Sequence, residues 1–258
     1  MLLAIDIGNT NTVIGAYRGT TLVDHLRLES RRSATEDEYG ALITTLLERR
    51  GIVLQDLRSA VIGSVVPPLT DVFASLCRRW LQVQPLVIGP GVRTGMPILY
   101  ENPREVGADR IVNAIAAYAR SGRETIVVDF GTATTFDVIS ARGEYLGGVI
   151  VPGIGISAEA LFARASKLPR VEIRRPDKVI GRTTVSAMQS GLVFGYIGLV
   201  EGLVARIAAE LGQTPYVIAT GGLAPLIAGG SESIEAVDEF LTLDGLRMVF
   251  ERNDEPAR

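Results

Sequence analysis

The 258-residue sequence predicts an α/β protein built from two related halves, each with the element order β-β-β-α-β-α-β. Three observations lead to this fold class. Apolar runs separated by short turns open the chain, amphipathic helices then alternate with apolar strands, and the opening pattern returns near residue 125. A chain of this length suffices for two small domains with cores of their own. We divide the halves at 1–110 and 111–258 and expect a cleft between them.

The first half starts as a meander of three strands, because short turns separate its first apolar runs. A helix follows: Thr35 and Glu38 have the spacing of a capping box, and the apolar residues from Tyr39 to Leu47 recur at the spacing of one helix face. The predicted strands are 2–5, 13–17, 21–28, 60–66 and 85–88, and a second helix is predicted at 71–81.

The second half repeats this order after a helix that ends near Gly122. Its predicted strands are 125–128, 136–139, 145–151 and 216–219, and its long helices are predicted near 184–211 and 239–252.

The repeat is clearest in two turns. The segments that begin at Asp6 and at Asp129 both have the pattern Asp-x-Gly-x-x-x-Thr between two apolar strands. Such internal duplication constrains a fold more firmly than local propensities do. A carboxylate at a strand end followed by Gly and hydroxyl or amide side chains suits a site for phosphate and a hard cation. Each loop alone is equally compatible with ordinary hairpin chemistry, and the matched pair favours the phosphate site.

A second candidate segment is Tyr100 to Arg110, which leads into an apolar helix. Asp109 could accept a proton from a substrate hydroxyl while Arg110 holds an anionic group. A carboxylate near a helix start is also a common cap, and the pattern alone leaves both interpretations open.

Two glycine-rich segments indicate less. Gly153 and Gly155 follow a strand and open a helix, but the third glycine of a dinucleotide fingerprint is missing. The glycines after Ala219-Thr220 either let the backbone approach a nucleotide or form a plain turn.

Composition excludes several classes of site. The chain has one cysteine, so it can form neither an intrachain disulfide nor a cysteine zinc cluster. Its two lysines, Lys167 and Lys178, do not stand in a P-loop pattern. With a formal charge of -3 the chain has no global attraction for nucleic acid or anionic membranes. The first residues resemble a buried strand rather than a signal peptide, and charges or Gly and Pro interrupt the apolar stretches. We therefore expect a cytoplasmic protein with no nucleic-acid or membrane partner.

Taken together, the two loops, the stretch Gly107-Ala-Asp-Arg-Ile-Val-Asn, Ile180-Gly-Arg-Thr-Thr and Met188-Gln-Ser-Gly resemble type III pantothenate kinases. The resemblance runs nearly end to end. That family belongs to the superfamily of acetate and sugar kinases, heat-shock 70 proteins and actin, so it implies a duplicated ribonuclease-H-like, actin-like ATPase fold. It also implies ATP-dependent phosphorylation of pantothenate to 4'-phosphopantothenate, the first step of coenzyme A biosynthesis.

The resemblance implies specific roles. Asp109 would be the general base, Asp6 would place Mg²⁺ on the ATP phosphates, and Asp129 would bind K⁺ or NH₄⁺. The implied ATP-binding residues are Asp6, Ile7, Gly8, Asn9, Thr10, Asn11, Thr12, Val13 and Thr132. The implied pantothenate-binding residues are Tyr100, Gly107, Ala108, Asp109, Arg110 and Thr184. A homodimer whose active site borrows from the partner subunit is implied as well.

Three alternatives remain at this point. The first is another small-molecule kinase of the same superfamily, which acetate, hexoses and glycerol would reveal. The second is a non-catalytic accessory protein, and intact Asp6, Asp109 and Asp129 speak against it. The third is a dinucleotide oxidoreductase built on Gly153 to Gly155, which a lack of NAD(P) binding would eliminate.

Overall fold

The computed structural model describes residues 1–254, and the chain divides into two compact units. One unit contains Met1–Ala116 together with the C-terminal helix α7 (Leu241–Asp254), and the other contains Ala117–Phe240. The sequence placed the boundary after residue 110 and assigned the last helix to the second half. The observed units differ on both points, and the packing of α7 gives the reason for the second.

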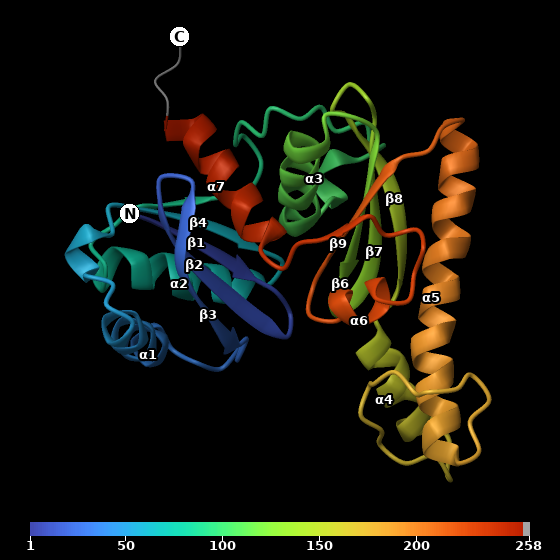
Figure 1. The fold of residues 1–258 in the computed structure, drawn as a ribbon. Coiled ribbons are helices and arrows are strands. Elements are labelled where there is room, and N and C mark those ends of the chain that lie inside the picture. Colours follow the sequence, from blue (N-terminus) through green and yellow to red (C-terminus); the bar gives the residue numbers. More distant parts are fainter. Residues whose placement is uncertain (255–258) are drawn as a thin grey trace. The chain divides into compact units, whose positions relative to one another are not determined.

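The first unit is built on a five-stranded sheet in the order β3-β2-β1-β4-β5 (Figure 1). Strands β1, β2 and β3 pair antiparallel, whereas β4 and β5 run parallel to β1. The strands are β1 (Leu2–Ile7), β2 (Asn11–Arg18), β3 (Thr21–Glu29), β4 (Ser59–Ser64) and β5 (Pro85–Val87). The helical segments are α1 (Glu36–Arg49), η1 (Leu54–Asp56), α2 (Pro67–Arg79), η2 (Pro103–Glu105) and the start of α3 (Ala108–Ser121).

The core of this unit forms because β1 and β4 are apolar on the face against which α1 and α2 pack. Ile5 and Ile62 of the strands and Phe73 of α2 are completely buried in one cluster. Helix α1 begins at the predicted capping box: the Thr35 hydroxyl accepts from the Glu38 N–H, and the Glu38 carboxylate accepts from the Thr35 N–H.

Helix α7 returns to this sheet because the sheet leaves room for it. A Cβ atom at Gly15 would lie 2.8 Å from Leu243, and one at Gly63 would lie 2.8 Å from Leu246. The Tyr17 hydroxyl also donates to Asp244 at 2.9 Å. An amphipathic helix pattern predicts α7 but carries no information about which sheet will cover its apolar face.

The second unit repeats the topology, with a sheet in the order β10-β9-β6-β7-β8. Strand β6 pairs antiparallel with β7 and parallel with β9, as β1 pairs with β2 and β4. The predicted duplicated α/β fold is therefore confirmed. The elements are β6 (Thr125–Phe130), β7 (Ala133–Ile139), β8 (Tyr145–Pro152), α4 (Ile154–Arg164), α5 (Thr184–Leu211), β9 (Tyr216–Thr220), α6 (Ala224–Ala228) and β10 (Ala236–Val237). The short elements α6 and β10 were not predicted.

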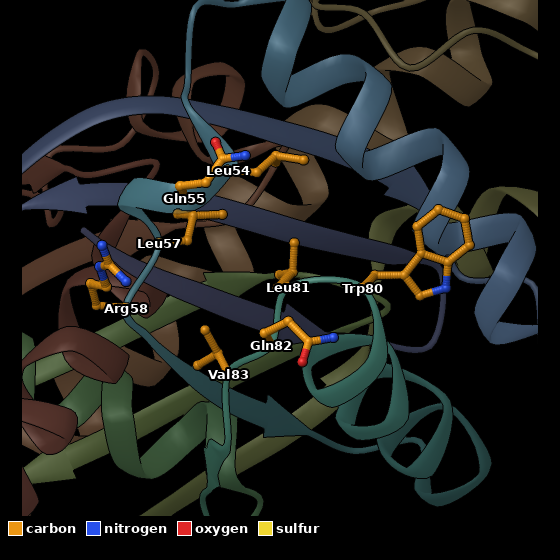
Figure 2. A pocket seen from close by; sticks show the side chains of 8 residues that line it. All are labelled: Leu54, Gln55, Leu57, Arg58, Trp80, Leu81, Gln82 and Val83. Carbon is orange, nitrogen blue, oxygen red and sulfur yellow. The ribbon is translucent and has the colours of Figure 1, made fainter.

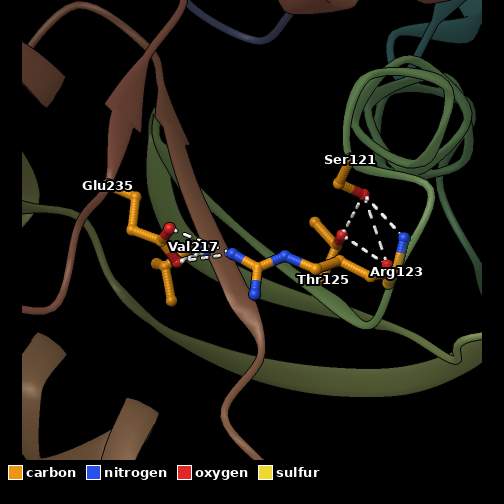
Figure 3. A network of polar contacts seen from close by, with 5 residues as sticks. All are labelled: Ser121, Arg123, Thr125, Val217 and Glu235. Atoms are coloured by element: carbon orange, nitrogen blue, oxygen red, sulfur yellow. Dashed lines mark hydrogen bonds and ion pairs between the residues drawn. The ribbon is translucent and has the colours of Figure 1, made fainter.

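A polar network holds the segment before β10 against β9 (Figure 3). The Arg123 guanidinium lies 3.0 Å from Glu235 Oε2, and Glu235 Oε1 accepts from the Val217 N–H at 3.3 Å. The hydroxyls of Ser121 and Thr125 lie 2.6 Å apart at the end of α3. These contacts hold the starts of β6 and β9 in place.

Helix α5 is 28 residues long and, among the described residues, is the one helix apolar enough to cross a membrane by length and composition. Val193 and Val200 of α5 are completely buried in the core of the second unit. Glu201 and Arg206 interrupt its C-terminal half. Of its most apolar 18-residue stretch, 33% is buried within this chain.

Candidate functional site

The Asp6 loop joins β1 to β2 at one edge of the first sheet. Asp6 is half-buried near the end of β1, opposite Val13 on β2 and Gly63 on β4. The Gly8 N–H donates to the Asn11 carbonyl at 3.0 Å and closes the loop. The loop therefore presents backbone groups and short polar side chains beside a single carboxylate.

The predicted ATP-binding residues of this loop differ in burial, and Asp6, Gly8 and Val13 are half-buried. Asn9, Thr10 and Asn11 are exposed, whereas Ile7 and Thr12 are completely buried. The Thr12 hydroxyl lies 2.9 Å from the hydroxyl of Ser30, whose N–H donates to the Thr10 carbonyl at 2.9 Å. Ile7 and Thr12 thus hold the loop in shape, and the exposed set faces solvent.

Asp109 lies in the first turn of α3 and is partly buried. Burial raises the pKa of its carboxyl above the ordinary value, although the N–H and the charge of Arg110 act in the opposite direction. The Arg110 N–H donates to Asp109 Oδ1 at 2.8 Å. A carboxylate with a raised pKa is a better proton acceptor than an ordinary aspartate.

Asp6 and Asp109 lie at the same edge of the first sheet. The Val65 N–H, directly after β4, donates to the Ile7 carbonyl at the end of β1 at 3.1 Å. A Cβ at Gly107 would lie 3.5 Å from Val65 and 2.4 Å from Asp109 Oδ1. The structure therefore brings the two predicted carboxylate positions to one edge, and glycine at 107 leaves room for the Asp109 side chain.

The other predicted substrate residues of this unit precede or follow Asp109. Tyr100 is half-buried in a bend before η2, and Ala108 begins α3. Arg110 is only 8% exposed, so its guanidinium is part of the interior of the site rather than of its surface.

The Asp129 loop joins β6 to β7 in the second unit. Asp129 is half-buried and lies opposite Thr135 on β7 and Thr220 on β9. Thr132 is exposed in the loop.

Two glycines approach this loop closely. A Cβ at Gly221, which has φ +91°, would lie 2.7 Å from both Asp129 Oδ1 and the Phe130 carbonyl oxygen. A Cβ at Gly153 would lie 2.1 Å from the Thr132 carbonyl oxygen. Neither sequence alternative for Gly221, a nucleotide contact or a plain turn, anticipated that its close neighbour is a carboxylate.

The two matched loops differ by one residue in register. Ile7 pairs with Thr12 across residues 8–11, whereas Phe130 pairs with Thr134 across residues 131–133. Thr12 therefore corresponds to the buried Thr134, and Val13 to Thr135. The sequence pattern equated Thr12 with Thr135, but pairing register depends on loop geometry and not on spacing from the aspartate.

Thr184 is the first residue of α5 and is exposed. The helix cap is the preceding residue, because the Thr183 hydroxyl accepts from the Ser186 N–H at 3.1 Å. The Thr184 side chain is therefore not needed for capping.

Within residues 1–254 there is no group of three or more His, Cys, Asp and Glu side chains arranged to hold a metal ion. Asp6 and Asp129 each offer one carboxylate, supplemented by neutral oxygen atoms. Mg²⁺ bound with a nucleotide uses such a set, because the phosphates supply further ligands.

A cavity of about 450 Å³ lies elsewhere on the first unit, between η1 and the end of α2 (Figure 2). Its lining includes none of the predicted site residues. It consists of Leu54, Gln55, Leu57, Arg58, Trp80, Leu81, Gln82 and Val83.

The family model for type III pantothenate kinase matches residues 2–206. The type III pantothenate kinase of Myxococcus xanthus is 59% identical over 253 residues, which cover 98% of this chain and 99% of that protein. A solved structure from Campylobacter jejuni, described as a member of the Baf family of transcriptional activators, has a TM-score of 0.62 at 20% identity and covers 97% of this chain and 98% of its own. A Sinorhizobium meliloti structure, described as a 2-dehydro-3-deoxygalactonokinase, has a TM-score of 0.61 at 14% identity and covers 100% of this chain and 98% of its own. The two structures share the fold, and the family match together with the close relative shows that this chain belongs to the type III pantothenate kinases.

Proposed function

We propose that this chain transfers the γ-phosphoryl group of ATP to the hydroxyl of pantothenate, with Asp109 as general base. The observation that carries the proposal is the position of Asp109, partly buried with a raised pKa, at the sheet edge that also carries Asp6. Asp109 accepts the proton of the attacking hydroxyl, and Arg110 and Tyr100 orient the substrate. The hydroxyl oxygen then attacks the γ-phosphorus while the bond to the β,γ-bridging oxygen breaks, and ADP leaves.

In this proposal the Asp6 loop binds the ATP phosphates. The exposed groups of residues 8–11 and Thr132 contact ATP, and Asp6 holds Mg²⁺ on it. The bound Mg²⁺ neutralises charge on the phosphate oxygens. Phosphoryl transfer asks a protein mainly for positioning and charge neutralisation, so these groups can replace a P-loop lysine.

A monovalent cation, K⁺ or NH₄⁺, binds at Asp129 in this proposal. The donor set fits: Asp129 Oδ1 and the Phe130 carbonyl oxygen both border the space that a side chain at position 221 would fill. Oxygen donors of this kind suit hard cations.

In this proposal Thr184 contacts pantothenate. The protein also forms a homodimer. Large apolar side chains are exposed along β8, α4 and the segment before α5, and Ile180 is 82% exposed. Ser190 of α5 donates to the Val179 carbonyl, so this segment is held in place on the helix. These exposed apolar side chains, which we call the apolar surface, are Ile150, Ile156, Leu161, Phe162, Val179 and Ile180. A second copy of the chain would cover it.

We also propose that the protein works in the cytoplasm.

The test is turnover of pantothenate with ATP and Mg²⁺ in K⁺ or NH₄⁺, compared with Na⁺ alone. We expect turnover that depends on K⁺ or NH₄⁺. Replacing Asp109 with Asn should lower the rate roughly 10²–10⁴-fold, while the exposed control Asp71→Asn leaves it unchanged. Near-normal turnover of Asp109→Asn would exclude the base assignment, and an inert folded protein would favour the accessory-protein alternative.

A further inference from the structure

A buried carboxylate lies beside the Asp129 loop, and the proposed reaction does not use it. Asp137 of β7 is completely buried. It accepts hydrogen bonds from the Tyr145 hydroxyl at 2.7 Å and from the Thr135 hydroxyl at 3.2 Å. Tyr145 is completely buried as well. Burial of a carboxylate is costly unless hydrogen-bond donors satisfy it, and here one hydroxyl donates to each Asp137 oxygen.

Strand register places this network on the same sheet face as Asp129. Thr135 lies directly opposite Asp129, and Asp137 follows two residues later on the same face. Paired side chains of antiparallel strands have Cβ atoms roughly 4.5–5.5 Å apart. Gly148 is the β8 residue opposite Asp137, so no β8 side chain lies directly across from the carboxylate.

The network determines what the Thr135 oxygen can do. The Thr135 hydroxyl donates to Asp137 Oδ2, and a threonine hydroxyl has only one proton to donate. Because that proton points to Asp137, the Thr135 oxygen presents its lone pairs to whatever lies beside it. An oxygen in this state suits a cation.

The first unit has no such hydrogen-bond network at the corresponding positions. Val13 stands where the second unit has Thr135, and Gly15 stands where it has Asp137. The network is therefore not a general requirement of the duplicated hairpin.

We propose that Asp137, held by Tyr145, is a positioning residue that fixes the Thr135 hydroxyl so that Thr135 Oγ1 becomes a ligand of the monovalent cation at Asp129. This inference rests on the cation site of the proposed function. Mutation of a residue that hydrogen-bonds to a metal ligand commonly changes the metal affinity by roughly 10–100-fold.

The test measures K⁺ binding without turnover. Thermal midpoints are recorded at increasing KCl, with choline chloride holding ionic strength constant, for the wild type and for Thr135→Val, Thr135→Ser, Asp137→Asn and Tyr145→Phe. We expect the half-saturating K⁺ concentration to rise roughly tenfold for Thr135→Val and Asp137→Asn. Thr135→Ser should keep the wild-type value because it retains the hydroxyl. Tyr145→Phe should give a half-saturating concentration between those of the wild type and Asp137→Asn. The K⁺ activation constant should shift in parallel, with the KM for pantothenate unchanged.

The matched control is Thr134→Val. Thr134 is the adjacent residue on the same strand and is completely buried on the opposite face, and its hydroxyl has no hydrogen-bond partner among the described residues. This variant should bind K⁺ as the wild type does. Equal K⁺ affinity of folded Thr135→Val and wild type would overturn the inference, as would a wild type whose midpoint does not respond to K⁺. The melting experiment needs no pantothenate, so failure of the proposed reaction would be recognised separately as absent turnover.

Discussion

In the proposed mechanism, Asp109 links activity to stability through its burial. Its folded-state pKa is raised, so the folded protein holds the proton more tightly than the unfolded chain, for which the ordinary value is 3.8. The carboxyl therefore favours folding when protonated, and this contribution is lost as pH rises through the raised pKa. Asp109→Asn removes the cost of burying a charge.

We therefore expect Asp109→Asn to be more thermally stable than the wild type at neutral pH, although it loses turnover. Its advantage should shrink as pH falls below the raised pKa and level off below about 3.8. Thermal melts of both proteins across this pH range measure the difference. A stability gap that does not change with pH would contradict the assignment of a raised pKa to Asp109.

Gly221 and the adjacent Gly222 allow a comparison of a crowded glycine with an uncrowded one. Gly221→Ala places a methyl group 2.7 Å from Asp129 Oδ1 on a residue with φ +91°, so it strains the backbone and displaces the carboxylate. We expect a loss of about 1–3 kcal/mol in unfolding free energy and weaker K⁺ activation. Gly222→Ala is the control, because its Cβ would meet no atom within 4 Å. Denaturant unfolding of both variants measures the difference, and equal effects would show that the close approach does not matter.

Helices α1 and α2 meet at a contact that depends on one glycine. A Cβ at Gly40 of α1 would lie 2.5 Å from the indole of Trp80, which ends α2 and donates from Nε1 to Asp37 at 3.2 Å. Alanine is intrinsically about 1 kcal/mol better than glycine inside a helix, so the clash and the propensity act in opposite directions.

The effect of Gly40→Ala on the free energy of unfolding should therefore have opposite signs in the presence and absence of the Trp80 indole. In the wild type it should destabilise the protein because the indole must move, whereas in a Trp80→Ala background it should stabilise by up to about 1 kcal/mol. Urea unfolding of the four proteins in this cycle gives both values. If the effects of Gly40→Ala and Trp80→Ala on the unfolding free energy simply add, the indole moves aside without cost.

The proposed homodimer makes a prediction for the whole molecule. Ile180→Glu puts a charge on a side chain that is 82% exposed in the apolar surface of the second unit, so it should give a monomer in sedimentation experiments. Turnover should fall with dissociation, because the family resemblance implies an active site that borrows from the partner subunit. Val53→Glu is the control: Val53 is 52% exposed in the first unit, and this variant should remain a dimer. A dimeric Ile180→Glu protein would place the interface elsewhere.

Much of this molecule follows from local pattern. Apolar alternation, the Thr35 capping box and the repeated Asp-x-Gly loops predicted most long elements, their order and the duplication, because each signal depends on residues near one another in the chain. The same patterns identified Asp6, Asp109 and Asp129 as candidate carboxylates. Short elements such as β10 have too few residues to carry a periodic signal.

Other features exist only through contacts between distant segments. The sheet that α7 covers, the one-residue difference between the two hairpins, the approach of Gly221 to Asp129 and the Asp137 network all result from such contacts. Periodicity shows that a helix has an apolar face, but not which surface will bury it. The sequence thus determined which elements form and which carboxylates stand at strand and helix ends. Tertiary packing decided which side chains meet, because register and burial are settled by the whole set of competing contacts.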